Sequence, residues 1–415
     1  MTQPVTQEKA PRRIFGFHPN VFFLGVVSFL TDVSSEMIFT LIPLFMANVL
    51  GAKTTLIGFV GGLSESTDAI FRIVSGRISD RLGKRKFLAT LGYGLSTVVK
   101  PLMYVANVWG WGGVAGVRFG DRIGKGLRSS SRDALLADSM LPYERGKGFG
   151  FHRAMDTSGA VLGLLLAALI VFLMQRNVTT LELPTFKMMV IVGSIPAVLA
   201  VIVLVALVRE KKRESVAATT AGGAQAIPLK KPFDLRFKLF LAVIAIFTLG
   251  NSSDFFLILR AQDSSAPLLQ VVLMLVALNL VYALVSIPVG VLSDKIGRRR
   301  VIAAGWFIYA AVYLGFALAT HVWQIWTLFI AYGLYYGIVE GVARAFVADL
   351  VPAERRGTAY GLYQGIIGLT LLPASLIGGW LWDRYNPAAT FYFGAALAFI
   401  AMVGIVLLVR ERAHD

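Results

Sequence analysis

The chain of 415 residues lacks cysteine, contains only four histidines, and carries charge on just 15% of its residues. Without cysteine, no disulfide and no cysteine-ligated metal cluster can form. A soluble domain has about a quarter of its residues charged, so the shortage of charge points away from a soluble protein. The form G-x-x-x-x-G-K-S/T is also absent from the sequence, which excludes a P-loop nucleotidase.

Hydrophobic residues, by contrast, make up 56% of the chain and gather into long apolar stretches. A helix needs about 20 such residues to cross the hydrocarbon core, and it satisfies its own backbone there. Barrel strands would alternate apolar and polar residues, a pattern that this sequence does not show. The sequence therefore predicts an all-α membrane protein with twelve transmembrane helices, near residues 20–49, 56–75, 87–106, 108–131, 148–174, 187–208, 238–259, 267–292, 301–319, 323–346, 357–381 and 388–409.

The net charge of +16 suggests a nucleic-acid-binding protein at first, but its distribution has another explanation. Lysine and arginine cluster in alternate connections between the apolar stretches, at Arg77–Lys86, Arg145–Lys147, Arg209–Arg213, Arg298–Arg300 and Arg355–Arg356. Cytoplasmic loops of membrane proteins carry such an excess. We therefore predict a multi-pass membrane protein with cytoplasmic N- and C-termini and no nucleic-acid partner. The polar N-terminus does not read as a removable signal peptide.

One eleven-residue segment occurs twice, since Gly76–Lys86 returns as Gly290–Arg300 at an offset of 214 residues. A second echo, of residues 137–150 in residues 348–361, supports the duplication. A duplicated half in an apolar chain is typical of transporters built from two related bundles. The predicted division is an N-terminal six-helix bundle over 1–208, a cytoplasmic linker over 209–237, and a C-terminal six-helix bundle over 238–415.

The repeated segment has the form G-x-x-x-D-R/K-x-G-R/K-R/K, and together with the predicted helices it resembles the major facilitator superfamily. The resemblance covers nearly the whole chain and implies that family's fold of two pseudo-symmetric six-helix bundles. In the family this loop latches helix ends across the two halves, through contacts that form in one state and break in the other. The resemblance thus implies a conformational latch made by Gly76, Asp80, Arg81, Gly83 and Arg85, and by Gly290, Asp294, Lys295, Gly297 and Arg299.

Two further family motifs are only partly present. Arg118 begins the span-4 form R-x-x-Q-G-x-G, but Asp121 replaces the glutamine and Arg122 replaces the first glycine. In proton-coupled relatives this arginine is tied to proton exchange, whereas here Asp121 offers it a neutralising partner. The span-5 form of family exporters, G-x-x-x-G-P-x-x-G-G, keeps Gly159 and Gly163 but lacks its proline.

Two acidic residues, Asp32 and Glu36, lie one turn apart on one face of predicted span 1. A charge in the hydrocarbon costs about 3 kcal/mol, so such residues are candidates for a cavity or a functional site. Two carboxylates this close do not easily both ionise, which suits a proton carrier or a cation site. The alternative is a structural pair with arginines of a neighbouring helix.

Further charged candidates lie in spans 5 and 7. Span 5 carries Arg153 and Asp156, and Asp156 is placed to orient His152 on the same helix face. The alternative is a solvated or interfacial pair, because both residues lie near the cytoplasmic end of the span. In span 7, residues 252–254 (Ser-Ser-Asp) echo residues 34–36 (Ser-Ser-Glu) of span 1. Spans 1 and 7 line the central cavity in the resembled family, so Asp254 is a candidate binding or coupling residue.

In span 10, Glu340 and Arg344 stand four residues apart, after Tyr332, Tyr335 and Tyr336. This spacing suits an intrahelical salt bridge that lowers the cost of burial, or a substrate clamp with tyrosine walls. Two other charged groups are expected to be structural. They are an interdomain contact set in span 2 (Glu65, Asp68, Arg72) and a solvated helix extension after span 4 (Lys125, Arg128, Arg132, Asp133). The alternative for the second group is a vestibule that attracts anions.

The resemblance implies a secondary active transporter of the cell inner membrane, not an enzyme, that moves a small solute by alternating access. Such a transporter needs no cofactor, because a proton gradient would supply the energy. We expect export of a small organic compound by a monomer in the lipid bilayer. An organic or phosphorylated anion is the alternative substrate if Arg118 and Arg344 are unpaired. A metal-ion exporter and a lipid-handling protein are further alternatives, although no metal site is predicted.

Overall fold

The computed structural model of the chain describes residues 13–82, 85–141, 144–175, 178–210, 233–352 and 355–409. Apart from one β-bridge between Ile14 and Phe17, the regular structure in these ranges is helical. The helices are α1 (Pro19–Phe39), α2 (Ile42–Leu44), η1 (Phe45–Val49), α3 (Thr54–Leu82), α4 (Arg85–Val99), η2 (Lys100–Trp109), α5 (Gly110–Asp138), α6 (Arg145–Met174), α7 (Leu183–Leu207), α8 (Leu235–Gly250), α9 (Phe255–Asp263), α10 (Leu268–Ile296), α11 (Arg298–Leu318), α12 (Val322–Leu350), α13 (Arg356–Arg384) and α14 (Pro387–Leu408).

These helices form twelve passages, which confirms the predicted fold class. The first passage joins α1, α2 and the π-helical η1, the third joins α4 and the 3₁₀-helical η2, and the seventh joins α8 and α9. In the described ranges, nine passages are long and apolar enough to cross a membrane. The other three are α3, α4–η2 and α5, and they contain buried charged side chains, including Asp68, Lys100 and Arg118.

Several helices extend further than their apolar stretches predict. Helix α3 continues to Leu82, α5 to Asp138 and α10 to Ile296. Most residues of the two repeated segments, 76–86 and 290–300, are therefore helical. The prediction of a loop at Gly76, after predicted span 56–75, was therefore wrong, whereas Gly290 is helical as predicted span 267–292 implies. Hydropathy detects only the part of a helix that lies in lipid, whereas backbone hydrogen bonds carry the helix on into water.

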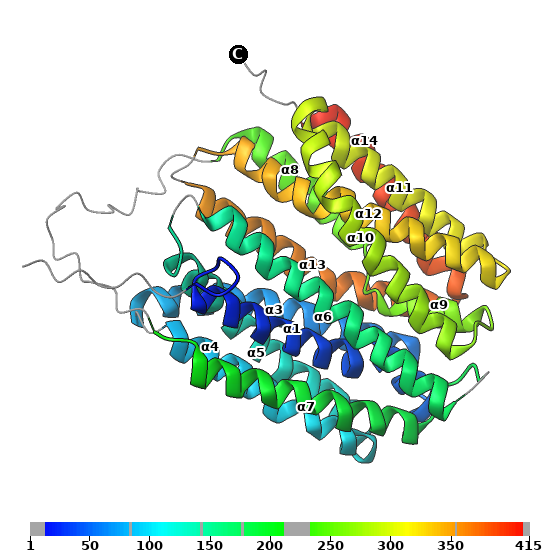
Figure 1. Ribbon diagram of the computed structural model, residues 1–415. Helices are drawn as coiled ribbons and strands as arrows, with labels where there is room; N and C mark the ends of the chain where they lie inside the picture. The colour runs from blue at the N-terminus through cyan, green and yellow to red at the C-terminus, as the bar shows by residue number, and fades with distance from the viewer. Residues whose placement is uncertain are drawn as a thin grey trace, which may run out of the picture.

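The helices of the first half, α1 to α7, lie together on one side of the structure, and those of the second half, α8 to α14, on the other (Figure 1). Within the first half, α1 packs against α6 and α7, and α5 packs against α3 and α4. Across the two halves, α3 packs along α13, α6 along α10, and α2 against α9. The division at 208 and 238 stays a prediction, and residues 211–232 of the predicted linker lie outside the described residues.

We call the end of the structure where α1 begins and α3 ends the basic end, and the end where α13 ends the opposite end. At the basic end, Arg85 donates to the Ala134 carbonyl at 2.9 Å and pairs with Asp138. In the second half, Arg298 makes the equivalent contacts with the Ala345 carbonyl, at 2.9 Å, and with Asp349. These matching contacts are the structural counterpart of the sequence repeat.

The latch residues can be followed only in part. Asp294 pairs with Arg298 at 3.0 Å, and Arg299 donates to the Val409 carbonyl at 3.0 Å, so both bind within the second half. The side chains of Asp80 and Arg81, and the whole of Gly83, lie outside the described residues. Gly76 and Gly290 are helical, and no contact among the described residues assigns a role to Lys295, so the latch remains a prediction.

One contact that joins the two halves at the opposite end is made by the carboxylate of Asp383, near the end of α13. It accepts hydrogen bonds from the backbone N–H of Thr54 at 3.0 Å, from that of Thr55 at 2.7 Å, and from the Thr55 hydroxyl at 2.6 Å. Thr54 and Thr55 begin α3, so a residue of one half caps a helix of the other. This cap stabilises the conformation in which the opposite end is closed.

Replacing Asp383 by alanine should therefore open the opposite end. Loss of a helix cap costs about 1 kcal/mol, which corresponds to an approximately fivefold shift toward the open conformation. Spin labels on Glu182→Cys and Tyr385→Cys measure the change as a longer inter-label distance, and the cysteine-free chain gives no background labelling. Asp263→Ala is the control, because Asp263 pairs with Arg260 of its own helix. Equal distance distributions in the two variants would contradict the cap.

Candidate functional site

A cavity of about 600 Å³ lies between the two halves. Residues of α1, α3 and α5 line it on one side, and residues of α8 to α13 line it on the other. Toward the opposite end the halves touch, since a Cβ on Gly61 would lie 2.5 Å from the Ser253 hydroxyl. Toward the basic end the lining is accessible, with the Arg344 side chain 49% exposed. The structure is thus open at the basic end and closed at the opposite end.

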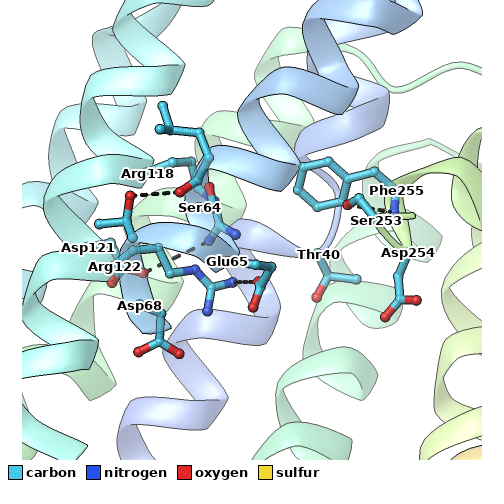
Figure 2. Close-up of polar contacts among 12 residues, drawn as sticks. Thr40, Ser64, Glu65, Asp68, Arg118, Asp121, Arg122, Ser253, Asp254 and Phe255 are labelled. Carbon is cyan, nitrogen blue, oxygen red and sulfur yellow. Dashed lines mark hydrogen bonds and ion pairs between the residues drawn. The ribbon is translucent and has the colours of Figure 1, made fainter. Parts of the chain in front are cut away.

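The wall from the first half is charged, and most of its arginines are paired. Figure 2 shows Glu65, Arg118, Asp121 and Arg122 gathered on one side of the cavity. Arg122 pairs with Glu65 at 2.8 Å, and Arg118 lies 3.9 Å from Asp121 with its guanidinium 4.6 Å from the centre of the Phe39 ring. Arg118 is buried and has the neutralising partner that the sequence suggested.

Asp32 and Glu36 both line the cavity. Glu36 accepts a hydrogen bond from Thr40 at 2.5 Å. Asp32 forms no hydrogen bond and no ion pair with any residue that the structure describes, although Lys125 and Arg128 act on it electrostatically from α5. The alternative of a structural ion pair between Asp32 and a neighbouring arginine is therefore not seen among the described residues.

The seventh passage is broken beside the cavity. Helix α8 ends at Gly250 and α9 begins at Phe255, so residues 251–254 are unwound. The freed backbone is satisfied by side chains, because Tyr309 donates to the Gly250 carbonyl at 3.2 Å and the Ser253 N–H donates to Ser375 at 3.1 Å. Broken helices of this kind form substrate and ion sites in transporters. The apolar pattern predicted one continuous span here, and the polar run was the only signal of the break.

Asp254 closes this broken segment and projects into the cavity, opposite the charged wall (Figure 2). Its carboxylate accepts hydrogen bonds from Tyr332 at 2.8 Å and from Tyr336 at 2.9 Å. Tyrosine rings surround it, and Phe247 and Trp306 stack nearby with ring centres 4.7 Å apart. The wall from the second half is thus aromatic around one carboxylate.

Glu340 joins the two halves at the basic side of the cavity. It forms the expected intrahelical salt bridge with Arg344 at 2.8 Å and also lies 3.4 Å from Arg153 of α6. Tyr282 donates to Glu340 at 2.6 Å and contacts Arg153 as well. Asp156 is not part of this group, since it faces His152 at 3.5 Å. Of the span-5 candidates, only Arg153 reaches the other half.

One prediction about α5 was wrong. Lys125 and Arg128, expected in a solvated extension, line the cavity, and Arg128 is buried with its guanidinium 4.7 Å from the centre of the Tyr93 ring. The reason is that α5 packs on α3 and α4 within the first half and turns its charged face to the cavity. Sequence reasoning also missed Lys100, whose only signal was a lysine within predicted span 87–106.

A metal-binding cluster is not assembled in the part of the chain that the structure describes. No three residues of the types His, Cys, Asp and Glu are grouped closely enough there to hold a metal ion. His152 has only Asp156 beside it as an acidic partner at ion-pair distance.

Comparisons with known proteins agree with this architecture. The sequence profile of the Major Facilitator Superfamily matches residues 24–278 and 239–415. An uncharacterized MFS-type transporter of Methanocaldococcus jannaschii is 38% identical over 397 residues, with 94% of each chain covered. The multidrug resistance protein MdtH of Salmonella arizonae is 23% identical, over 87% of this chain and 86% of its own length.

Solved structures show the same fold. The crystal structure of a D-xylose-proton symporter superposes with a TM-score of 0.75 at 17% identity, over 95% of this chain and 97% of that one. At that identity the likeness concerns the fold alone. The extent of the profile match and the close archaeal relative establish the family: the chain belongs to the Major Facilitator Superfamily and is a multi-pass membrane transporter, not an enzyme.

Proposed function

We propose that the protein exports a small organic compound, cationic or neutral, in exchange for protons across the inner membrane. The observation that carries the proposal is Asp32, a carboxylate that lines the cavity and has no hydrogen-bond or ion-pair partner among the described residues. An unpaired acid within a membrane helix is free to take up and release a proton. Uptake of a proton neutralises the Asp32 carboxylate, which then no longer attracts a cationic substrate.

The lining of the cavity supports a cationic or neutral substrate. It contains six carboxylates (Asp32, Glu36, Glu65, Asp121, Asp254, Glu340) and five basic side chains (Arg118, Arg122, Lys125, Arg128, Arg344). Arg118 and Arg344, the arginines on which an anion site would depend, both have carboxylate partners. Aromatic faces such as those of Tyr336 and Trp306 attract organic cations and apolar rings.

The mechanism we infer is alternating access around this cavity. The structure is open at the basic end, so the substrate enters there and meets Asp32 and the aromatic wall. Release at the other side requires two changes. The basic end must close, a state that the repeated segments Gly76–Lys86 and Gly290–Arg300 would stabilise, and the Asp383 cap at the opposite end must break. Protonation of Asp32 would shift the balance between the two states, since a charged and a neutral acid differ in hydration.

One relative supports export as the direction of transport. MdtH carries the name of a multidrug resistance protein, and it matches most of this chain. The alternatives are transport of an organic or phosphorylated anion, export of a metal ion, and lipid handling. The pairing of Arg118 with Asp121 argues against the anion. The lack of a metal-binding cluster within the described ranges argues against the metal ion.

Proton movement in proteoliposomes tests the proposal. The wild-type chain should acidify or alkalinise the lumen when ethidium or another organic cation is added, because each transport step exchanges substrate for protons. Organic acids, phosphate esters and divalent metal ions serve as the other members of the panel. Flux with organic cations or neutral drugs supports the proposal. Flux with anions or metals alone would replace its substrate class, and a lack of flux with the whole panel would reject proton coupling.

A further inference from the structure

Lys100 is a fully buried lysine in the first half, at the point where α4 changes to the 3₁₀-helical η2. Its residue exposure is 0%, and Pro101 follows it. Insertion of a lysine into the hydrocarbon costs about 3 kcal/mol, so the structure must compensate the ammonium. The charged clusters described above and the proposed function assign no role to Lys100.

The Lys100 ammonium is compensated by neutral oxygens of one turn of α1. It lies 3.0 Å from the Ser34 hydroxyl, 3.0 Å from the Ser35 hydroxyl and 3.5 Å from the Thr31 carbonyl. An ammonium has three donors, so these oxygens occupy all of them. No carboxylate lies within ion-pair distance of Lys100 among the described residues, and the charge is therefore solvated but not neutralised.

The carboxylate that is available to this charge is Asp32. Among the charged groups that act on Lys100, Asp121 of α5 acts most strongly, followed by Arg128 of α5 and then by Asp32 and Glu36 of α1. Those acting on Asp32 are Asp156 from α6, Lys125 and Arg128 from α5, and Glu36. Asp121 is already bound by Ser96 and Glu36 by Thr40. Asp32 is left without a partner, in the same helical turn as the serines that hold the ammonium.

The fold itself does not require a cation at this position. The equivalent passage of the second half is α11, the third passage after the linker. After Arg300 it contains no charged residue, and buried tyrosines such as Tyr309 and Tyr313 fill its inner face. The duplicated half thus builds the same helix position without a buried charge, and Lys100 is a specific addition to the half that carries Asp32.

From these contacts we infer that Lys100 is a positioning residue for proton coupling, which alternates between the serine hydroxyls of α1 and the Asp32 carboxylate. When Asp32 holds a proton, the ammonium stays on Ser34 and Ser35, as in this structure. When Asp32 releases its proton, the ammonium moves to the carboxylate and leaves the hydroxyls, which breaks the hydrogen bonds that tie the start of η2 to α1. The inference rests on the proposed role of Asp32 and adds the group that senses its charge.

Infrared difference spectroscopy of the full-length chain tests this exchange without a substrate. The protonated Asp32 carboxyl is identified as the band that Asp32→Asn deletes, and the pH at which it is half lost is measured in each variant. Lys100→Gln keeps a donor but removes the cation, so the midpoint should rise by about one pH unit. Lys100→Arg keeps the charge and should leave the midpoint in place. Lys187→Gln, a lysine on α7 that lies over Tyr104, is the matched control.

A second variant gives the opposite sign and remains informative if Lys100→Gln does not fold. Removing both hydroxyls, by Ser34→Ala with Ser35→Ala, frees the ammonium for Asp32 and should lower the midpoint. Ser64→Ala is its control, since that hydroxyl binds only the Val60 carbonyl of its own helix in the described structure. A merely structural lysine predicts no shift in either direction.

The outcomes separate this inference from the proposed function. Unchanged midpoints in Lys100→Gln and in the double serine variant overturn the role of Lys100, even if wild-type liposomes move protons. Absence of any band that Asp32→Asn deletes overturns it as well, because Asp32 then does not change its protonation. Wild-type liposomes that move no protons reject the proposed function, while shifted midpoints would still establish the exchange between Lys100 and Asp32.

Discussion

Asp32→Asn is expected to abolish gradient-driven transport while leaving exchange of substrate across the membrane intact. Asparagine has the shape of a protonated aspartate but can neither release nor accept a proton at neutral pH. The variant should therefore still bind substrate and change conformation, because the cavity keeps Glu36, Asp254 and the aromatic wall. Uphill movement fails, since no proton accompanies the substrate in either direction.

The experiment compares two rates in the same proteoliposomes. Counterflow exchange of labelled ethidium is measured without a gradient, and accumulation is measured with an imposed pH gradient. Asp263→Asn is the control, because its carboxylate pairs with Arg260 at the opposite end and does not line the cavity. Loss of both rates in a folded Asp32→Asn variant would show that Asp32 binds substrate, and would contradict its role as the proton carrier.

The fold could be predicted from the sequence because each helix that crosses the bilayer needs a run of about 20 apolar residues. Apolar runs of spanning length predicted every passage, and the duplicated segment predicted two related halves. Ends such as that of α3 at Leu82 were missed, since a helix that leaves the lipid no longer needs apolar residues. Hydropathy averages over a window, so it also passed over the break at residues 251–254.

The candidate site was predictable where charge stands out against an apolar background. Asp32, Glu36 and Asp254 were singled out in this way, and each of them lines the cavity. What the sequence could not give was the partner of each charge, because pairs such as Arg153 with Glu340 join residues far apart in the chain. The unpaired state of Asp32 depends on three-dimensional packing alone. So do the hydrogen bonds from Lys100 to the hydroxyls of Ser34 and Ser35.

The glycines of α3 allow the opposite end to close, and Gly58 has the least room. A Cβ at Gly58 would lie 2.3 Å from the Ser375 carbonyl oxygen and 2.9 Å from the Phe256 ring. The oxygen belongs to the backbone of α13, which cannot turn away as a side chain can. Because α3 and α13 belong to different halves, a larger residue at Gly58 should hold the halves apart at this end without disturbing either half.

Gly58→Leu is therefore expected to give a folded protein that does not transport. A carrier that cannot close the opposite end cannot return to the state open at the basic end, so each turnover stops there. Labels on Glu182→Cys and Tyr385→Cys should report a longer distance than in the unmodified background. Gly94→Leu is the silent control, since nothing lies within 4 Å of a Cβ at Gly94.

A second glycine separates this steric block from simple misfolding. A Cβ at Gly124 would lie 2.6 Å from the Gly92 carbonyl oxygen, but that contact joins α5 to α4 within one half. Gly124→Leu should accordingly reduce the yield of folded protein, as overpacking of a close helix contact costs about 1–3 kcal/mol. If Gly58→Leu instead transports at the wild-type rate, or is lost in the same way as Gly124→Leu, then closure of α3 on α13 is not the step that completes the transport cycle.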